Sequence, residues 1–529
     1  MCGIFSYKGN KNNWASLAKD INLISYRGPE NTHHEMVAAD VLFAFHRLAI
    51  MGTTEMSDQP MKHPNNDSLT LICNGEIYNY KKLAEKYNFL LETGSDCEII
   101  LFMFEKFGIE KTVQELDGVF MFVIHNAKSG KLFAARDPMG VRPGFIGWDG
   151  DDIMIASEAK PLVKHCDDIV PFTPGTWWCS DVPDKFNPYF HFNGVLIQEK
   201  TEDDICVKIR LLLTAAVKKR LMADREIGCL LSGGLDSSLI TSLVVKYYNG
   251  PKLNTFSIGL PGSVDLEYAQ RVADFLGTAH HQVEVSEQEF LCAIKTVIYN
   301  IESYDTTTVR ASVGNYLVSK FITENSDCKV IFNGDGADEV CCGYVYLRKA
   351  PSSSALQKES ERLVKEIHYF DVLRSDRSIS SNGLEARTPF LDKAFVKYYL
   401  SIPPELKMFE GEEQLEKHLL RKAFDGQNLL PDDIIWRRKC AFSDGVSSVK
   451  KSWHTIIQNY VDRIISDEEF ERESTKISHC PPALKESYYY RKIYQQFFGE
   501  HDNLIPHFWL PKWTDVIDPS ARELKDYQE

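Results

Sequence analysis

The first 190 residues alternate between short apolar runs and polar turns. The runs VLFAFHRLAI, LTLICNGEIYNY, VFMFVIHNAKSGKLFAARD and IMIASEAK are rich in β-branched and aromatic residues, and Gly, Pro, Asn and Asp separate them. Two segments, 14–24 and CEIILFMFEKFG, instead place apolar residues at helical spacing. The pattern predicts sheets flanked by helices in this part of the chain.

A different pattern begins after a polar, irregular stretch at 186–202. The run DDICVKIRLLLTAAVKKRLM is helical, and the strands EIGCLL, LNTFSIG and CKVIFN, apolar enough to be buried on two faces, then alternate with helices. This alternation predicts a doubly wound α/β domain with a parallel sheet. We therefore expect two domains, 2–190 and 200–529. The acidic, proline-containing end from Trp509 is typical of a loose tail.

Composition narrows the class of protein. The chain has 529 residues, 43% of them apolar and 26% charged, which is typical of a globular protein of more than one domain. We find neither an apolar run of membrane-spanning length nor a signal-peptide pattern, so we expect a cytoplasmic protein. A net charge of −15 argues against a nucleic-acid surface. The thirteen cysteines show no zinc-like spacing and predict neither a metal centre nor a disulfide framework.

The most specific motif is LLSGGLDSS at 230–238. It follows a strand and enters the apolar helix SLITSLVVKYY, so Gly233 and Gly234 allow the backbone to approach an anion at a helix N-terminus. The hydroxyls of Ser232, Ser237 and Ser238 add donors, and we expect a phosphate-binding loop. A bare Gly-Gly would more often be a tight turn. The lysine of a GxxxxGK[ST] loop is missing, which argues against γ-phosphate transfer of that type.

This motif resembles the pyrophosphate loop of the ATP pyrophosphatases, which adenylate a carboxyl or carbonyl group and release pyrophosphate. The resemblance implies ATP as substrate and a Mg²⁺ ion held by Asp236. It also places Leu230 and Ile258, at the ends of neighbouring strands, beside the nucleoside.

Five stretches of the first half together resemble the glutaminase domain of class II amidotransferases. They are CGI at the start, HRLAI at 46–50, NGEIYN at 74–79, GSDCE at 94–98 and RDPMGVRP at 136–143. These domains are N-terminal nucleophile hydrolases with an α-β-β-α sandwich. The resemblance implies that Met1 is removed and that Cys2 becomes the first residue.

A free α-amine on Cys2 would suit general base catalysis, because its reference pKa is roughly 7.7 to 8.0. The Cys2 thiolate would attack the side-chain amide of glutamine and release ammonia. By resemblance, Asn74 and Gly75 form the oxyanion hole, Arg47 binds the glutamine α-carboxylate, and Glu76 and Asp96 bind its α-ammonium. The remaining residues expected to bind glutamine are Leu48, Ala49, Ile50 and Met51.

Each of these residues also has a purely structural explanation. A cysteine at position 2 is usually accidental, Arg47 could form a surface ion pair, and Asp96 could cap a helix. Their joint occurrence in the order of the family favours the functional interpretation. We interpret His33, His34 and His46 as structural.

Taken together, the chain up to about Val446 resembles the glutamine-hydrolysing asparagine synthetase family. Supporting stretches are TTTVRAS at 306–312, GDGADE at 334–339, GLEARTPFLD at 383–392 and RRKCAFSDGV at 437–446. The resemblance implies that aspartate and ATP form a β-aspartyl-adenylate and pyrophosphate, and that ammonia then displaces AMP. Implied roles are nucleotide contact for Asn333 and Gly334, phosphate neutralisation for Arg310 and Lys439, and amino-acid binding for Asp371 and Arg374. Ion pairs on helix surfaces would explain the last four equally simply.

One position departs from the family pattern. The second phosphate-side loop reads NGDGADE at 333–339, with Asp335 where the family usually has glutamate. We expect Asp335 to take over the catalytic carboxylate, although it is one methylene shorter. The alternative is that Asp335 only caps a helix beginning near Ala337.

Three other interpretations were weighed. A sugar-phosphate or phosphoribosyl amidotransferase would share the first half but not SGGLDSS, and a β-lactam-forming relative normally lacks the cysteine. A scaffold without activity is disfavoured by the intact Cys2 and the intact loop. The expected partners are therefore glutamine, aspartate and ATP, without nucleic acid or membrane, and a homodimer is left open.

Overall fold

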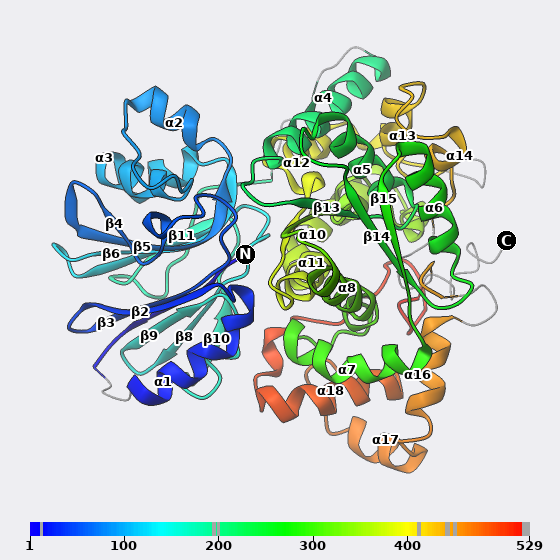
Figure 1. Ribbon diagram of the computed structural model, residues 1–529. Helices are drawn as coiled ribbons and strands as arrows, with labels where there is room; N and C mark the ends of the chain where they lie inside the picture. Colours follow the sequence, from blue (N-terminus) through cyan, green and yellow to red (C-terminus); the bar gives the residue numbers. More distant parts are fainter. Residues whose placement is uncertain are drawn as a thin grey trace. The chain divides into compact units, whose positions relative to one another are not determined.

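The computed structural model describes residues 1–10, 14–192, 197, 201–409, 414–439, 445–447 and 452–520. These residues fall into two compact units (Figure 1). The first unit comprises Met1–His191 together with two short segments from further along the chain, Met222–Arg225 and Ser380–Glu385. The second unit comprises Phe192–Leu221, Glu226–Ile379 and Ala386–Glu529.

The first unit is a sandwich of two six-stranded antiparallel sheets. One sheet has the order β10 (Asp168–Pro171), β8 (Phe145–Asp149), β9 (Asp152–Ala156), β1 (Gly3–Lys8), β3 (Val41–Arg47) and β2 (Asn31–Ala38). The other has the order β12 (Asn187–Pro188), β11 (Thr176–Cys179), β7 (Lys131–Arg136), β6 (Gly118–Asn126), β5 (Asn66–Ile77) and β4 (Met61–His63).

Helices cover the outer faces of this sandwich. Figure 1 shows α1 (Trp14–Ile21) beside the first sheet, and α2 (Tyr80–Tyr87) and α3 (Glu98–Glu115) over the second. The predicted α-β-β-α arrangement is therefore confirmed. The helix expected over 14–24 ends earlier, at Ile21, and continues as a 3-10 helix.

Side-chain alternation in the central strands creates two separate cores. In β6, Phe122 points toward helix α3 while its neighbour Val123 points toward the other sheet. In β5, Cys73 and Ile72 divide in the same way. Successive side chains of a strand point to opposite faces. A strand that is apolar on both faces therefore contributes side chains to both cores. This explains why these runs lack the polar alternation of a sheet with one solvated face.

The second unit contains a five-stranded sheet. Its order is β15 (Ala279–Glu284), β14 (Asn254–Gly259), β13 (Ile227–Leu230), β16 (Val330–Phe332) and β17 (Glu385–Arg387). Strand β13 pairs in parallel with both β14 and β16, and β14 pairs in parallel with β15. The predicted doubly wound parallel sheet is confirmed.

The chain order changes direction at β13. Strands β14 and β15 extend the sheet to one side, while β16 lies on the other. Such a switch point opens a crevice at the carboxyl ends of the strands, where open α/β sheets bind their ligands. The loops after β13 and β16 therefore meet at this crevice.

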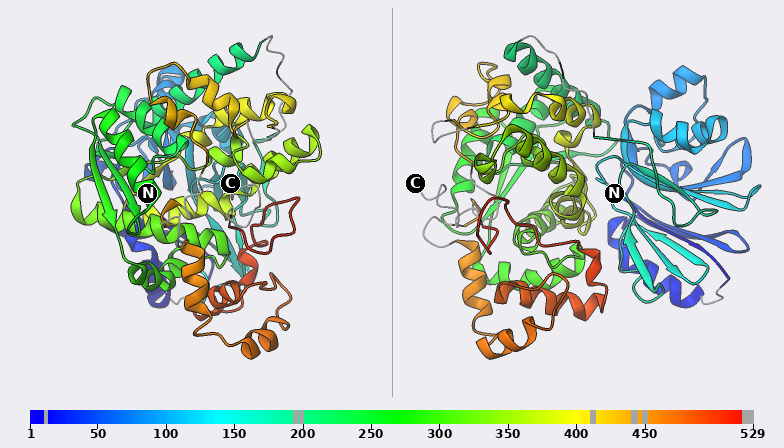
Figure 2. Two further views of the ribbon diagram at one scale, coloured as in Figure 1. Left: turned by 90° about the vertical axis from the view of Figure 1, so that its right-hand side faces the viewer. Right: turned by 180° about the vertical axis from the view of Figure 1, so that it is seen from behind.

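Helices surround this sheet and extend beyond it (Figure 2). Those between the strands are α4 (Glu202–Arg220), α5 (Leu235–Tyr247), α6 (Val264–Leu276), α7 (Glu287–Ile301), α8 (Thr306–Asn325), α9 (Ala337–Val340), α10 (Ser353–Glu366) and α11 (Asp371–Ser380). The later ones are α12 (Lys393–Ser401), α13 (His418–Phe424), α14 (Asp432–Ile435), α16 (Trp453–Val461), α17 (Asp467–Ser474) and α18 (Lys485–Phe498).

The expectation of a loose tail from Trp509 is wrong for residues 509–520. Trp509, Asp518 and Ser520 are buried, and Trp509 packs against the rings of Tyr344 and Tyr346. Local composition gave the wrong prediction because the partners of this segment lie far away in the sequence. Residues 521–529 are outside the described part of the chain. No helix in the described ranges is long and apolar enough to span a bilayer.

Candidate functional site

A small pocket of the first unit surrounds Cys2. All the residues expected to bind glutamine line it except Asn74, which instead contacts Cys2 directly. The lining includes Cys2, Arg47, Leu48, Ala49, Ile50, Met51, Gly75, Glu76, Asp96 and Glu385. The structure thus brings together residues from the ends of β1, β3 and β5 and from the start of α3.

Cys2 directly precedes β1 and contacts Asn74 and Leu48. Its backbone N–H donates to Asn74 Oδ1 at 3.0 Å, and its sulfur lies 3.6 Å from the carbonyl oxygen of Leu48. Burial raises the pKa of the Cys2 thiol. The other side-chain atom of Asn74, Nδ2, is buried and has no hydrogen-bond partner among the described residues. A buried donor without a partner costs free energy, so such an atom is a candidate for contact with a ligand.

Met1 is present in this structure, so the nitrogen of Cys2 is a peptide N–H. The amine of Met1 is buried and lies 3.5 Å from Glu385 Oε2. Burial lowers the pKa of this amine, and the charge of Glu385 opposes the shift only in part.

Two charged residues of this pocket are already engaged. The Arg47 guanidinium donates to Asp58 Oδ1 and to the carbonyl oxygen of Gly52. Asp96 Oδ2 accepts a hydrogen bond from the backbone N–H of Ile77, so it joins α3 to the end of β5. A ligand carboxylate at Arg47 would therefore share the guanidinium with Asp58.

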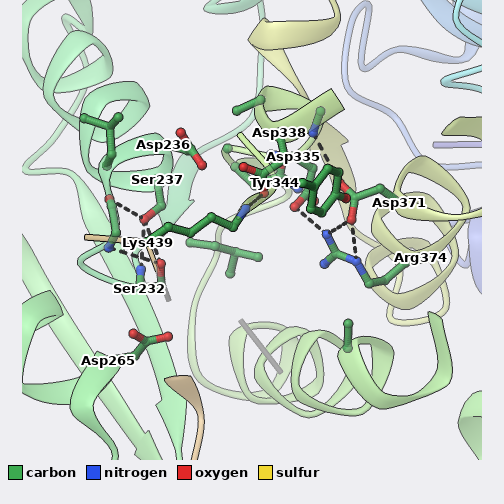
Figure 3. A pocket seen from close by; sticks show the side chains of 18 of the residues that line it. Ser232, Asp236, Ser237, Asp265, Asp335, Asp338, Tyr344, Asp371, Arg374 and Lys439 are labelled. Carbon is green, nitrogen blue, oxygen red and sulfur yellow. Dashed lines mark hydrogen bonds and ion pairs between the residues drawn. The ribbon is translucent and has the colours of Figure 1, made fainter. Parts of the chain in front are cut away.

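The larger pocket lies in the second unit, at the carboxyl ends of β13, β14 and β16 (Figure 3). Of the residues expected at a nucleotide site, it is lined by Leu230, Ser232, Gly234, Asp236, Ser237, Ile258, Asn333, Gly334, Asp335, Asp371, Arg374 and Lys439. Three other candidates, Gly233, Ser238 and Arg310, are not part of this lining.

The loop after β13 is shaped by glycine and serine. Gly233 has φ +72°, and a Cβ there would lie 2.4 Å from the backbone of Tyr268, so a larger residue cannot fit without a shift. Ser232 and Ser237 join the two ends of the loop through hydroxyls 3.0 Å apart. Ser238 is fully buried and does not line the pocket.

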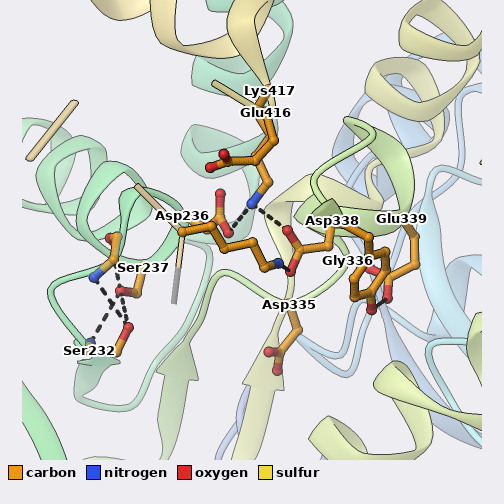
Figure 4. A network of polar contacts seen from close by, with 12 residues as sticks. Ser232, Asp236, Ser237, Asp335, Gly336, Asp338, Glu339, Glu416 and Lys417 are labelled. Atoms are coloured by element: carbon orange, nitrogen blue, oxygen red, sulfur yellow. Dashed lines mark hydrogen bonds and ion pairs between the residues drawn. The ribbon is translucent and has the colours of Figure 1, made fainter. Parts of the chain in front are cut away.

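A buried lysine links the two loops that meet at the switch point (Figure 4). Lys417 Nζ contacts Asp236 Oδ2 and lies 2.5 Å from Asp338 Oδ1, and its side chain is only 3% exposed. Lys439 contacts the other oxygen of Asp338. Burial alone would lower the pKa of Lys417, but the two carboxylates outweigh it and raise this pKa. The two lysines in turn outweigh the effect of burial on Asp338 and lower the pKa of its carboxyl.

Asp335 belongs to a second cluster in the same pocket. Its Oδ1 accepts from Arg374 Nη2 at 2.8 Å, and Arg374 Nε also donates to Asp371 at 3.0 Å. The side-chain oxygen of Asn333 accepts from the backbone N–H of Asp335 at 3.3 Å. Burial raises the pKa of Asp335, Arg374 acts in the opposite direction, and Asp371 adds to the increase.

The alternative in which Asp335 caps a helix is wrong. Helix α9 begins at Ala337 and its N-cap residue is Gly336, whose backbone N–H donates to Asp371 Oδ2 at 3.3 Å and not to Asp335. The carboxylate of Asp335 faces Arg374 in the pocket instead. The departure from the family pattern therefore leaves a carboxylate in the pocket.

The expected phosphate contact of Arg310 is also wrong. Its guanidinium is buried and bound by two carboxylates, Glu486 and Asp518, through four hydrogen bonds of 2.6 to 2.8 Å. Together they outweigh the effect of burial and raise the pKa of Arg310. Both carboxylates come from the last 50 residues of the described chain, where the sequence offered no motif.

Other residues of the pocket were not predicted. Lys417 lies in no recognisable motif, and Asp338 belongs to the GDGADE stretch, whose sequence indicated no role for it. Tyr344, whose ring lies 4.8 Å from Lys439 Nζ, and Trp509 were also missed. Asp338 follows Asp335 by three residues, and this short spacing could have indicated that both carboxylates reach the same pocket.

Comparison with known proteins gives matches along the whole chain. The family model described as asparagine synthase matches residues 208–362 and 348–517, and the one described as glutamine amidotransferase domain matches residues 1–171. Asparagine synthetase [glutamine-hydrolyzing] of Gallus gallus is 42% identical over 559 aligned residues, which cover 100% of this chain and 99% of that protein. The Homo sapiens protein of the same name is 41% identical with the same coverage.

Among solved structures, the glutamine phosphoribosylpyrophosphate amidotransferase from B. subtilis, complexed with ADP and GMP, matches with a TM-score of 0.33. It is 16% identical in sequence, and the match covers 54% of this chain and 81% of that one. This similarity is too low to add to the argument.

The fold and the two sites define an N-terminal glutamine amidotransferase domain joined to a nucleotide-binding synthetase domain. With more than 40% identity over its full length to curated members, the chain belongs to the family of glutamine-hydrolysing asparagine synthetases.

The position of Lys417 leads to a test of stability. Lys417→Met removes the cation shared by two partly buried carboxylates, of which Asp338 keeps Lys439, and we expect the free energy of unfolding to fall by about 2 kcal/mol, between the values for exposed and buried pairs. Millimolar Mg²⁺ should restore part of the loss, because a divalent cation can replace the missing charge. Chemical unfolding with and without Mg²⁺ measures both effects.

The matched control is Lys422→Met, which breaks an exposed pair with Glu202. We expect little change for this variant, because exposed pairs contribute little. A Lys417→Met protein as stable as the wild type would contradict the role assigned to this lysine.

Proposed function

We propose that this chain makes asparagine from aspartate and ATP, using ammonia that it releases from glutamine. The reaction passes through a β-aspartyl-adenylate and yields AMP, pyrophosphate and glutamate as by-products. The observation that carries the proposal is the presence in one chain of two pockets. In one, Cys2 lies beside Asn74, whose Nδ2 has no partner among the described residues; in the other, the Ser232–Ser237 loop lies beside Asp236, Asp338, Lys417 and Lys439. Membership of the family supports the same assignment.

In the first pocket, Cys2 supplies both nucleophile and base. Removal of Met1 frees the α-amine of Cys2, which accepts the thiol proton. The thiolate then attacks the side-chain amide carbon of glutamine, ammonia leaves, and water hydrolyses the resulting thioester to glutamate. Asn74 Nδ2 and the backbone N–H of Gly75 stabilise the negative oxygen of the tetrahedral intermediate. Among the described residues Asn74 Nδ2 has no hydrogen-bond partner, which supports this role.

The rest of this pocket holds the amino-acid end of glutamine. We assign the α-carboxylate to Arg47, because a guanidinium can bind a carboxylate through two parallel hydrogen bonds. Glu76 and Asp96 take the α-ammonium, and the segment Leu48–Met51 forms the remaining wall.

In the second pocket, the loop after β13 binds the phosphates of ATP. Backbone N–H groups at the start of α5 and the hydroxyls of Ser232 and Ser237 donate to the phosphates that leave as pyrophosphate. Lys439 and Lys417 balance the charge that builds up on the leaving group. Leu230 and Ile258 contact the nucleoside, and Asn333 and Gly334 contact the nucleotide from the loop after β16.

The proposal includes Mg²⁺. The described residues hold no group of three or more His, Cys, Asp and Glu side chains that could bind a metal alone. Mg²⁺ commonly binds through one or two carboxylates together with phosphate oxygens and water, and Asp236 and Asp338 offer two carboxylates at the loop. Asp236 Oδ1 is buried without a partner among the described residues, which fits a ligand role. When bound, the ion neutralises phosphate charge.

Asp335 is assigned to the second half-reaction. Ammonia that attacks the β-carbonyl carbon of the adenylate carries an ammonium charge as the C–N bond forms, and a nearby carboxylate can accept the proton. Asp335 lies beside Arg374 and Asp371, which we assign to the aspartate substrate. Asn333 bonds to the backbone of Asp335 and so fixes the loop that presents it.

The proposal extends to the organisation of the protein. We assign residues 2–190 to the glutaminase domain and 200–529 to the synthetase domain. We propose a cytoplasmic location and small-molecule substrates alone, without nucleic acid or membrane. A monomer and a homodimer are both compatible with this function.

Cys2→Ala tests the first half-reaction. We expect glutamine hydrolysis and glutamine-dependent synthesis to be abolished, while synthesis from added ammonium persists, because only the nucleophile is removed. Glutamate and asparagine formation measure the two activities, and mass spectrometry of the native protein should find Met1 missing. Cys292→Ala, which removes an exposed thiol, is the control. Normal glutamine hydrolysis by Cys2→Ala would refute the assignment.

Asp236→Asn tests the phosphate loop. We expect aspartate-dependent pyrophosphate release to fall by at least about tenfold, since loss of a group that supports a metal costs 10- to 100-fold. Basal glutamine hydrolysis should remain, because Cys2 and Asp236 lie in different units. Asp433→Asn removes an exposed carboxylate paired with Arg271 and serves as the control. Equal loss of both activities would point to misfolding instead.

Asp335→Asn tests the carboxylate of the second half-reaction. We expect asparagine formation from ammonium to fall by about a hundredfold, the order of loss that misplaced reacting groups cause, with glutaminase activity kept. Asp335→Glu should be tolerated or more active, because it restores the residue usual in the family. Asparagine formation by Asp335→Asn at the wild-type rate would remove Asp335 from the mechanism.

A further inference from the structure

The end of the described chain forms one wall of the larger pocket, the one in the second unit, which we call the synthetase pocket. We name residues 509–520 the C-terminal strap; it is part of the segment that follows α18, coloured red in Figure 2. Trp509, Pro511 and Pro519 of the strap line the pocket together with the loops after β13 and β16. The strap therefore touches the same space as the groups assigned to ATP and aspartate.

The far end of the strap is fixed by Arg310. Asp518 accepts two hydrogen bonds from this guanidinium, at 2.7 and 2.8 Å, and Glu486 accepts two more at 2.8 and 2.6 Å. Asp518 also accepts from Gln458 Nε2 at 2.8 Å and from the backbone N–H of Ser520 at 2.8 Å. Such bidentate charged contacts are both strong and directional.

The near end of the strap is fixed by a second residue at the start of the same helix. Asp305 Oδ1 accepts from the backbone N–H of Trp509 at 2.8 Å, while its Oδ2 caps α8 by accepting from Thr308. Asp305 and Arg310 thus hold the two ends of the strap from the first turns of one helix.

Helix α8 also faces the pocket itself. Thr307, Ala311, Asn315 and Val318 line it, at the spacing of three and four residues that defines one face of a helix. Arg310 lies outside this stripe and bonds to the strap. A single rigid helix therefore sets the position of two neighbouring walls.

The strap also packs against Tyr344, one of the residues that line the pocket. The ring of Trp509 lies 5.2 Å from that of Tyr344, whose hydroxyl donates to Glu339 at 2.5 Å. Lys439, which contacts Asp338, lies 4.8 Å from the face of the same tyrosine. The strap thus packs against Tyr344, which lines the same pocket as Asp335 and Arg374.

We propose that the C-terminal strap completes the site that holds aspartate and its adenylate, and that Arg310, Asp305 and Asp518 are positioning residues for it. This inference rests on the proposed function. A well-placed wall at this point orders the binding surface and keeps water from the adenylate, whose hydrolysis would consume ATP without forming asparagine. Arg310 thus acts on the reaction through the strap and not by touching phosphate.

The test is Asp518→Asn in the full-length protein, assayed with ammonium so that the glutaminase site is bypassed. We expect the KM for aspartate to rise by about tenfold, as it would if the competent arrangement were populated about a tenth of the time. More than one pyrophosphate should be released per asparagine formed. Hydrogen exchange of the backbone N–H groups of Trp509 and Ser520 should accelerate, and basal glutamine hydrolysis should be unchanged.

The control is Asp502→Asn, which breaks the pair with the buried Arg491 close by but leaves the strap intact. It should lower stability without changing the KM for aspartate or the ratio of pyrophosphate to asparagine. The same pattern in Asp518→Asn would overturn the proposal, because it would mean that the cluster around Arg310 is only structural.

A second variant covers the case in which Asp518→Asn does not fold. Pro519→Gly loosens the strap and leaves every buried charge in place, so it should change the KM and the product ratio in the same direction by a smaller factor. Wild-type values for Pro519→Gly would also overturn the proposal. Asparagine formation by the wild type in the same assay tests the proposed function independently of the strap.

Discussion

The buried ammonium of Lys417 is the charge on which the synthetase pocket depends. It lies between Asp236, after β13, and Asp338, after β16, and so joins the two loops that meet where the chain order of the sheet reverses. Two carboxylates this close repel each other, and Lys417 offsets the repulsion between Asp236 and Asp338, while Lys439 contacts Asp338 from the other side. Lys417 therefore holds together the two carboxylates that a divalent cation would need.

Local charge also explains how an acidic chain can bind a polyanion. The net charge is −15, yet the charges that line the pocket balance, because six acidic side chains are matched by six cationic ones: Arg374, Lys417, Arg421, Arg437, Arg438 and Lys439. In a recessed site, nearby charges outweigh distant ones, because solvent and salt screen the latter. The overall charge is the basis for predicting no nucleic-acid surface, but it carried no information about this pocket.

The sequence was informative wherever function depends on neighbours along the chain. The SGGLDSS loop was predicted because strand, turn and helix follow one another within a few residues, whereas Cys2 was predicted from several short stretches that together resemble one family. The alternation of strands and helices predicted the parallel sheet of the second unit. Arg310 was placed wrongly because its partner Asp518 lies 208 residues away. Lys417 was missed for the same reason, since it lies 181 residues from Asp236. Pairings of this kind arise from packing, and no local pattern signals them.

The close approach of Gly334 to the phosphate loop has a consequence for the order of folding. A Cβ at Gly334 would lie 2.8 Å from the backbone nitrogen of Ser237, so the two loops touch backbone to backbone. They are separated by almost a hundred residues, and closing so long a segment is slow compared with forming a helix. The site that the two loops form together is therefore complete only after β16 has paired with β13. A partly folded chain that has made β13 and α5 carries the whole motif and still lacks the site.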